Sequence, residues 1–473
     1  MNRFAFGLSR FLLLPLLVAP LLIAGCENTA GNKPTTDTAA AAKPTPRQQQ
    51  PKPEPLPPGL QTGGLDDIET NRAKDSLDSL YALNRPEGEQ APLRVAVLLP
   101  LSGIAAGAGD IMLKAAQLAV FDSGEKRLML MPHDTKSTPE GAIAAAEAAD
   151  ADGAQLVLGP LFGDHVQPVA QVMAPKNIPV LAFSNDQSAA GNGAAILGLT
   201  PESELRRMLS YAGQRGLRRI AAFLPDSDYG YLVAEKIRSL APQLGLEAAR
   251  INHYPAGAQA SDDALLQAAR SFASYDARRS ALARERSKLQ SRGDSISRRA
   301  LARLSGSDTF GAPPYDAVLL AEPRNRLPTI APLLAFYDVD PKRVQFLGMS
   351  SWYGDGLGRE PSLVGSWFTG PDPEQYEALM KRYSEKYNMY PGRLAALAYD
   401  AVAVAADLVG SVGPEGRITS DQILLSSGYA AYYGPFRVNR EGTTDRLLSI
   451  IQIDPDGLTV IDRAPATFDT LTN

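Results

Sequence analysis

The stretch that decides the fold class is RVAVLLPL, residues Arg94–Leu101. It is aliphatic and β-branched without alternation, and at eight residues it is too short for a typical helix. Continuous apolar runs of this length are typical of strands buried on both faces, as in parallel sheets. Ser102-Gly103 follows, and then a helical pattern runs from Asp110 to Asp122. The first unit of the domain is therefore predicted to be a strand followed by a helix.

The same unit repeats along the chain. We expect further strands at Leu128–Pro132, Gln155–Leu158, Ile178–Phe183, Arg219–Leu224, Ala248–Tyr254, Ala317–Ala321 and Val344–Leu347. We expect helices between them near 138–151, 165–176, 202–215, 229–244, 261–290 and 326–337. This regular alternation of strand and helix predicts an α/β fold built on parallel sheets.

The end of the domain departs from the alternation. Two consecutive helices, 373–388 and 393–410, precede an expected hairpin. In that hairpin, residues 434–438 would pair with residues 447–454 through a turn at 440–442. The strands are too many for one ordinary sheet, so the sequence favours two lobes.

The beginning of the chain predicts export. Arg3 and Arg10 supply positive charge, and the apolar stretch 11–23 is shorter than the roughly 20 residues that a spanning helix needs. Residues 1–25 are therefore interpreted as a signal peptide. They end in Leu22-Ile23-Ala24-Gly25-Cys26, a run that resembles the bacterial lipobox and implies acylation of Cys26. The alternative is an ordinary signal peptide followed by a chance cysteine.

Cys26 is the single cysteine of the chain, so no disulfide can form within it. Two or three acyl chains on Cys26 would anchor the protein stably. By the same resemblance, Glu27 in place of Asp favours the outer membrane, with the protein facing the periplasm. Residues 26–92 are rich in Pro and Ala and predict a flexible tether, although a passive spacer would have the same composition.

The charge distribution is uneven. The formal net charge is −5, which argues against general nucleic-acid binding. Residues 276–308 nevertheless carry nine basic and four acidic side chains, a balance of +5. Their sparse apolar residues predict a helical extension or a hairpin that projects from the domain. It is either a solvated helix face or partly disordered insert, or a docking surface for an acidic partner, with Arg278, Arg279, Arg298 and Arg299 as the candidate contacts.

The sequence argues against catalysis. The three histidines, His133, His165 and His253, fall on different predicted elements. The chain has no HExxH, P-loop, nucleophile elbow or Cys/His cluster. We therefore predict a protein that is not an enzyme and that has no metal site and no cofactor.

Several phrases carry a family resemblance. They are Val97-Leu98-Leu99-Pro100-Leu101-Ser102-Gly103, Gly159-Pro160-Leu161 with Gln167-Pro168, Ile178-Pro179-Val180-Leu181, Pro225-Asp226-Ser227-Asp228-Tyr229-Gly230 and Tyr433-Gly434-Pro435-Phe436. In this order they resemble the type I periplasmic binding-protein fold, best known from the leucine/isoleucine/valine-binding protein. The resemblance covers residues 93–463.

The resemblance implies two lobes, each a mostly parallel sheet flanked by helices, with three hinge crossings near Thr200-Pro201, Thr369-Gly370-Pro371 and Tyr433-Gly434. Lobe one would hold 93–200 and 371–430. Lobe two would hold 201–370 and 434–463, with the basic insert 276–308.

The resemblance also implies a ligand cleft at the carboxyl ends of the strands. The family's ligand-binding serine falls at Gly163 and its ligand-binding acid near Ser350, so the partner for an α-ammonium group is expected to be absent. The alternative to an open cleft is a sealed interface whose polar residues cap helices. The candidate cleft residues are Ser102, Ser184, Asn185, Tyr229, Ser350 and Trp352.

An acylated lipoprotein with a tether, this fold and a basic insert resembles the penicillin-binding-protein activators. The resemblance implies a non-catalytic lipoprotein that binds and activates an inner-membrane penicillin-binding protein, a peptidoglycan synthase. One alternative is a lipoprotein receptor for an amino acid or related small molecule that feeds an ABC transporter. Another is an envelope hydrolase, which the missing catalytic motifs disfavour.

Overall fold

The computed structural model describes residues 91–256, 261–413, 416–465 and 467–468. The chain divides into two compact units, Met1–Asn84 and Arg85–Asn473, and everything described below belongs to the second. The expected signal peptide, Cys26 and nearly all of the expected tether lie outside the described residues.

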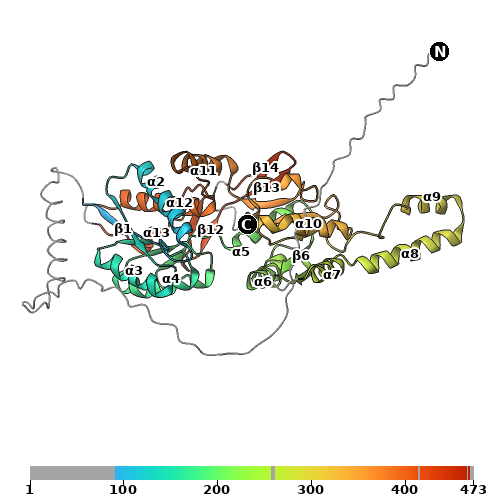
Figure 1. Ribbon diagram of the computed structural model, residues 1–473, viewed down its shortest axis with the longest axis horizontal. Coiled ribbons are helices and arrows are strands. Elements are labelled where there is room, and N and C mark those ends of the chain that lie inside the picture. Colours follow the sequence, from blue (N-terminus) through green and yellow to red (C-terminus); the bar gives the residue numbers. More distant parts are fainter. Residues whose placement is uncertain (1–90, 257–260, 414–415, 466, 469–473) are drawn as a thin grey trace, which may run out of the picture. The chain divides into compact units, whose positions relative to one another are not determined.

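The first sheet has five parallel strands in the order β2-β1-β3-β4-β5. They are β1 (Leu93–Leu99), β2 (Leu128–Asp134), β3 (Leu156–Leu158), β4 (Val180–Ala182) and β5 (Ala194–Ile196). The stretch that suggested the fold forms β1, and Val95–Leu99 are fully buried. They are buried because helices cover both faces of the sheet (Figure 1).

The two faces carry helices from different parts of the chain. One face packs on α3 (Pro139–Ala151) and α4 (Gly163–Met173). The other packs on α2 (Ala106–Ser123) together with α11 (Pro373–Tyr387) and α12 (Arg393–Ser411), which arrive from much later in the sequence. Helix α12 is long and apolar enough to cross a membrane, but 72% of its most apolar window is buried. It is the central core helix of this lobe.

The second sheet has seven strands in the order β14-β13-β10-β9-β8-β6-β7. β13 pairs antiparallel with β10 and β14, and the other pairs are parallel. One face packs on α5 (Pro201–Gln214) and α6 (Asp228–Gln243), the other on α7 (Asp262–Phe272) and α10 (Leu327–Phe336). The strands are β6 (Arg219–Pro225), β7 (Glu247–Tyr254), β8 (Ala317–Leu319), β9 (Gln345–Gly348), β10 (Trp367–Gly370), β13 (Ser449–Asp454) and β14 (Gly457–Asp462).

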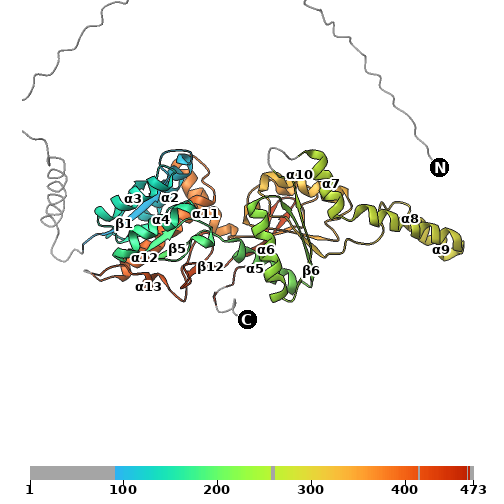
Figure 2. The ribbon, with the colours of Figure 1, turned by 90° about the horizontal axis from the view of Figure 1, so that it is seen from below.

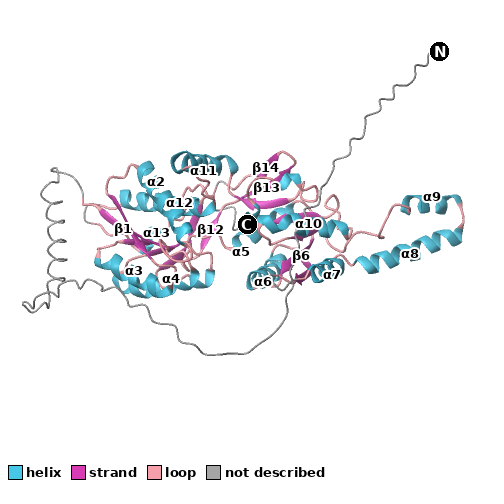
Figure 3. Ribbon diagram, in the orientation of Figure 1, coloured by secondary structure: helices cyan, strands magenta, loops and turns pink. Residues whose placement is uncertain are grey.

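Figure 3 shows the strands of both sheets enclosed by helices. The short elements are α13 (Ser420–Ile423) and the 3-10 turns Ala174–Lys176, Gln187–Ala189, Arg324–Arg326, Ser350–Trp352 and Leu357–Arg359.

The expected closing hairpin is wrong in its pairing. β11 (Phe436–Val438) pairs with β12 (Thr444–Arg446) in a separate two-stranded sheet. The run at 447–454 instead begins with buried Leu447 and Leu448 and enters the second sheet as β13. The three-residue strand β12 lies closer to the turn and pairs with β11. The longer apolar run after it therefore joins the larger sheet as β13.

Two buried charged residues fix the segment around this hairpin. The Asp400 carboxylate on α12 accepts hydrogen bonds from the backbone N–H groups of Tyr432 and Tyr433, at 2.8 and 3.0 Å. Arg446 donates to the carbonyls of Gly434 and Leu197, at 2.8 and 2.9 Å. Burial raises the pKa of Asp400 to about 6. These bonds satisfy backbone groups that would otherwise be buried without partners.

The expected helix 261–290 is two helices. Ser274 adopts a left-handed conformation with φ of 50°, and α8 (Tyr275–Arg292) starts there in a new direction. Helix α9 (Ser295–Leu304) then packs back on α8. Residues 275–304, which we call the α8–α9 hairpin, project away from the second sheet in both Figure 1 and Figure 2.

Candidate functional site

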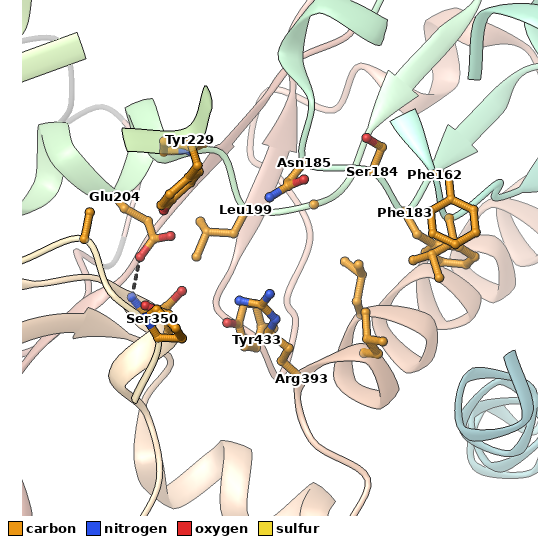
Figure 4. Close-up of a pocket in the computed structure, with 18 of the residues that line it drawn as sticks. Phe162, Phe183, Ser184, Asn185, Leu199, Glu204, Tyr229, Ser350, Arg393 and Tyr433 are labelled. Carbon is orange, nitrogen blue, oxygen red and sulfur yellow. Dashed lines mark hydrogen bonds between the residues drawn. The ribbon is translucent and has the colours of Figure 1, made fainter. Parts of the chain in front are cut away.

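A cavity of about 610 Å³ lies where the carboxyl ends of strands from both sheets meet. Phe183 to Asn185 follow β4, Ser227 and Tyr229 follow β6, and Ser350 follows β9. Side chains at the carboxyl ends of parallel strands converge on one edge, which is where open α/β sheets bind ligands. Figure 4 shows this arrangement.

Four of the six expected cleft residues line the cavity. Ser184 and Asn185 come from the first sheet, and Tyr229 and Ser350 come from the second. The Ser184 hydroxyl accepts a hydrogen bond from the Asp186 backbone at 3.0 Å. The Tyr229 hydroxyl donates to the sulfur of Met349 at 3.4 Å, and burial raises its pKa. Both side chains are therefore held by neighbours while they border the cavity.

The other two expected cleft residues were assigned wrongly. Ser102 is exposed, and its hydroxyl donates to the Asp134 carboxylate at 2.6 Å, which closes the loop after β1. Trp352 is fully buried in the second lobe, and its ring stands 6.2 Å from that of Phe368. A turn of 3-10 helix directs this indole into the core, so it cannot stack on a ligand in the cavity.

The sequence predicted that the partner for an α-ammonium group is absent because Ser350 stands at the family's acid position, but two other acids, Glu204 and Glu322, line the cavity. Glu204 lies on α5, where its carboxylate accepts hydrogen bonds from Ser350 N and, at 2.8 Å, from the Thr369 hydroxyl. Burial raises the pKa of Glu204. It contributes to the cavity wall mainly by fixing the loop after β9.

Glu322 differs from Glu204 in its hydrogen bonding. It lies three residues after the end of β8, it is only 4% exposed, and burial raises its pKa to about 7. Its Oε1 is buried and has no hydrogen-bond partner within the described part of the chain. A buried carboxylate without a partner is costly, so this atom is open to a donor from a ligand. The sequence signal was an acid shortly after a buried strand.

Two further side chains of the wall come from later in the chain. Arg393 begins α12 and supplies a guanidinium group, and Tyr433 precedes β11. Their distance along the sequence from the other wall residues kept them out of the sequence prediction. The rest of the wall is largely apolar, with Leu161, Phe162, Phe183, Leu199, Leu394 and Leu397.

A second cavity of about 500 Å³ shares wall residues with the first, among them Ser350, Arg393 and Tyr433. Its own lining is aromatic and charged: Tyr353, Tyr376, Tyr390, Arg324, Asp355 and Glu377. Burial, together with Glu377 and Asp355, raises the pKa of Tyr390 to about 12. The tyrosines therefore remain neutral hydrogen-bonding groups at physiological pH.

The three histidines of the chain lie away from both cavities. His133 lies in β2, His165 in α4 and His253 in β7, and none of the three lines either cavity. Among the described residues, no group of three or more His, Cys, Asp or Glu side chains is placed to hold a metal ion. The walls offer hydrogen bonding, charge and apolar surface, which are the means of binding.

The comparison with known families agrees with this architecture. The family model described as "Periplasmic binding protein" matches residues 92–457, most of the chain. The chain belongs to the periplasmic binding protein family. The expected α/β fold, with mostly parallel sheets flanked by helices, is thereby confirmed.

Solved structures of periplasmic binding proteins share the fold. A putative branched-chain amino acid ABC transporter protein from Rhodospirillum rubrum superposes with a TM-score of 0.61 at 18% identity, over 78% of this chain and 100% of that one. The C-domain of LpoA from Haemophilus influenzae, described as a regulator of PBP1A, superposes with a TM-score of 0.53 at 16% identity, over 78% and 99%. At these identities the likeness is one of fold.

Two curated relatives match over part of the chain. The penicillin-binding protein activator LpoA of Glaesserella parasuis is 30% identical over 163 residues, which are 34% of this chain and 27% of that protein. The uncharacterized protein RP748 of Rickettsia prowazekii is 20% identical over 177 residues, 37% and 47% of the two chains. The matched region thus spans less than half of either relative.

On this periplasmic binding protein domain, the expected partner surface needs one correction. Arg278 is only 7% exposed, and it donates to the Gly311 carbonyl at 2.8 Å and to the Asp338 carboxylate at 3.0 Å. It joins the α8–α9 hairpin to the lobe and cannot meet a partner. Arg279, Arg298 and Arg299 are exposed on the hairpin, as expected.

Proposed function

We propose that the protein is a non-catalytic envelope lipoprotein that binds and activates a penicillin-binding protein, and so regulates peptidoglycan synthesis. The observation that carries the proposal is the 30% identity over 163 residues with a protein named penicillin-binding protein activator LpoA. The fold that the chain shares with the LpoA C-domain agrees with it. The missing catalytic constellation in the cavities also favours a binding role.

The proposal includes a membrane anchor. An acylated Cys26 would hold the protein in the outer membrane, facing the periplasm, while the partner sits in the inner membrane. The 66 residues from 27 to 92, at ~3.1–3.3 Å per residue, could extend over about 200 Å when pulled straight. That length would allow the domain to reach a distant partner.

The direct test measures a purified bifunctional peptidoglycan synthase with and without the processed protein. We expect binding and a faster rate of glycan polymerisation or cross-linking. A solute-binding protein of the same fold is the matched control, because it presents the same architecture without the proposed activity. Absence of both binding and stimulation would overturn the proposal.

A solute receptor that feeds an ABC transporter is the second candidate, and the large cavity favours it. Glu322 offers a carboxylate oxygen without a partner, Arg393 offers a guanidinium group, and apolar side chains line the rest. This chemistry fits an amino acid or a related amine with an apolar body. At 100 times its dissociation constant such a ligand would add ~2.7 kcal/mol of stability, which a thermal-shift screen of amino acids and amines detects.

A further inference from the structure

The α8–α9 hairpin sorts its basic side chains into two groups with different roles. The first group faces inward. Arg278 bonds to the lobe, and Arg286 donates to the backbone carbonyls of Leu304 and Ser307 at 2.5 and 3.0 Å. Leu282 and Leu289 are buried on the same side of α8. These contacts hold the hairpin closed and attach its base.

The second group forms a stripe on the outside of α8. Arg284, Lys288 and Arg292 are exposed and lie at i, i+4 and i+8, so they share one face of the helix. Lys288 lies 3.8 Å from Glu285. Arg284 and Arg292 make no ion pair within the described part of the chain. Like charges at this spacing repel one another, so the stripe does not stabilise the isolated hairpin.

The hairpin holds this stripe in a defined geometry. Gly293 takes the left-handed conformation that ends α8, with φ of 64°. Asp294 caps α9, because its carboxylate accepts a hydrogen bond from Ser297 N at 2.7 Å. A surface ordered before binding loses less conformational entropy when a partner docks. Arg298, Arg299 and Arg303 of α9 add exposed positive charge to the same projection.

We propose that the stripe Arg284, Lys288 and Arg292 is a docking surface for an acidic protein surface, carried by the peptidoglycan synthase of the proposed function, on which this inference rests. The insert has a balance of +5 on a chain of net −5, and such a basic patch attracts a surface of opposite charge. A membrane is a poorer fit. Helices that lie on lipid expose an apolar face, whereas the leucines of α8 are buried inward.

The test is a binding titration of the processed full chain against the purified synthase at low and high salt. The hairpin variant carries Arg284→Glu, Lys288→Glu and Arg292→Glu, and a second variant carries Gln at the same positions to preserve helix propensity. The matched control reverses three exposed charges elsewhere, Lys126→Glu, Lys381→Glu and Arg440→Glu. Circular dichroism verifies that every variant is folded.

We expect the hairpin variants to bind at least about tenfold more weakly at low salt, and the control variant to stay within about twofold of the wild type. The difference should shrink as salt rises, because salt screens exposed charges. If the wild type binds and the hairpin variants bind equally well, the docking surface is wrong and the proposed function stands. If the wild type does not bind, the proposed function fails and the docking surface with it.

A vesicle arm tests the membrane. The same variants are mixed with phosphatidylglycerol vesicles. If the wild type binds these vesicles through the stripe while its binding to the synthase is independent of the stripe, the proposal is overturned in favour of a lipid contact.

Discussion

Arg278 Nη2 donates to Asp338 Oδ2 at 3.0 Å, and this bond joins the α8–α9 hairpin to the turn after α10. The same guanidinium donates to the carbonyls of Gly311 and of Asp338 itself. The next residue along the chain, Arg279, is exposed. Two adjacent arginines of one basic insert thus have opposite roles, one structural and one available to a partner.

We therefore expect Arg278→Ala to lower the free energy of unfolding by about 1–3 kcal/mol, because the half-buried Asp338 carboxylate and the carbonyls of Gly311 and Asp338 lose their charged donor. Arg279→Ala is the matched control and should change it by less than about 0.5 kcal/mol. Urea denaturation of both variants makes the measurement. Equal stability of the two variants would contradict the structural role of Arg278.

Glu322 gives a prediction of pH dependence. Its pKa in the folded protein is raised to about 7 by burial, above the ordinary value of 4.5. The folded state therefore binds the proton more tightly than the unfolded state, and stability is lost as pH rises from about 4.5 to 7. Glu322→Gln removes this pH dependence. As pH rises from about 4.5 to 8, the free energy of unfolding of the variant should therefore increase by about 2–3 kcal/mol relative to that of the wild type.

Denaturation curves of both proteins at several pH values test this difference. Asp316→Asn is the contrasting variant. Hydrogen bonds from Arg218 and Arg219 lower the pKa of Asp316, so the stability that this carboxylate contributes is lost as pH falls, not as pH rises. A parallel pH dependence of the wild type and Glu322→Gln would show that Glu322 titrates normally. If an amine ligand binds there, its affinity should also rise with pH through about 7, as Glu322 ionises.

Trp352 tests the division between core and cavity. Its ring is fully buried, and a Cβ at Gly348 would come within 2.2 Å of it. Trp352→Ala should therefore cost about 3–5 kcal/mol of stability. Tyr229→Phe, at the cavity wall, keeps the ring and should cost far less. Intact stability in Trp352→Ala would place the indole outside the core.

The sequence predicted the elements whose burial is uniform. β1 could be predicted because Val95–Leu99 face helices on both sides, so every position is apolar. β5 (Ala194–Ile196) was missed because two of its three residues are alanines with weak strand preference. The sequence did not predict the strand register or the strand that pairs with residues 447–454. Both depend on competition between two sheets, and a local sequence pattern carries no information about that competition.

The sequence could predict a cavity residue only where its position at the end of a strand places it in the cavity wall. Ser184, Asn185 and Ser350 follow strands, so the carboxyl-end rule finds them. Trp352 follows a strand too, but the turn after β9 sends its side chain inward. Glu204 and Arg393 reach the wall from helices, and Arg393 does so from a part of the chain far away in sequence. Tertiary packing alone brings these groups together.

The anchor gives a prediction for the region outside the described residues. Changing Cys26→Ser removes the thiol that acylation requires, so the protein should move to the soluble periplasmic fraction or remain unprocessed. Membrane fractionation with an antibody to the folded domain measures the outcome. A processed chain that still sediments with the outer membrane would refute the lipobox interpretation.

The tether gives the last prediction. Deleting Asn32–Pro58 removes 27 residues, which at ~3.1 Å each shortens the reach by roughly 85 Å. The deleted residues are rich in Pro and Ala and precede the domain whose first strand begins at Leu93, so we expect the melting temperature of the domain not to change. The variant should nevertheless fail to support synthase activation in cells, while the purified variant still binds the synthase in solution. A replacement of the same 27 residues by a Gly/Ser linker of equal length is the matched control and should restore function, because reach rather than sequence is what the proposal requires. Full activity of the deletion variant in cells would show that the tether is a passive spacer.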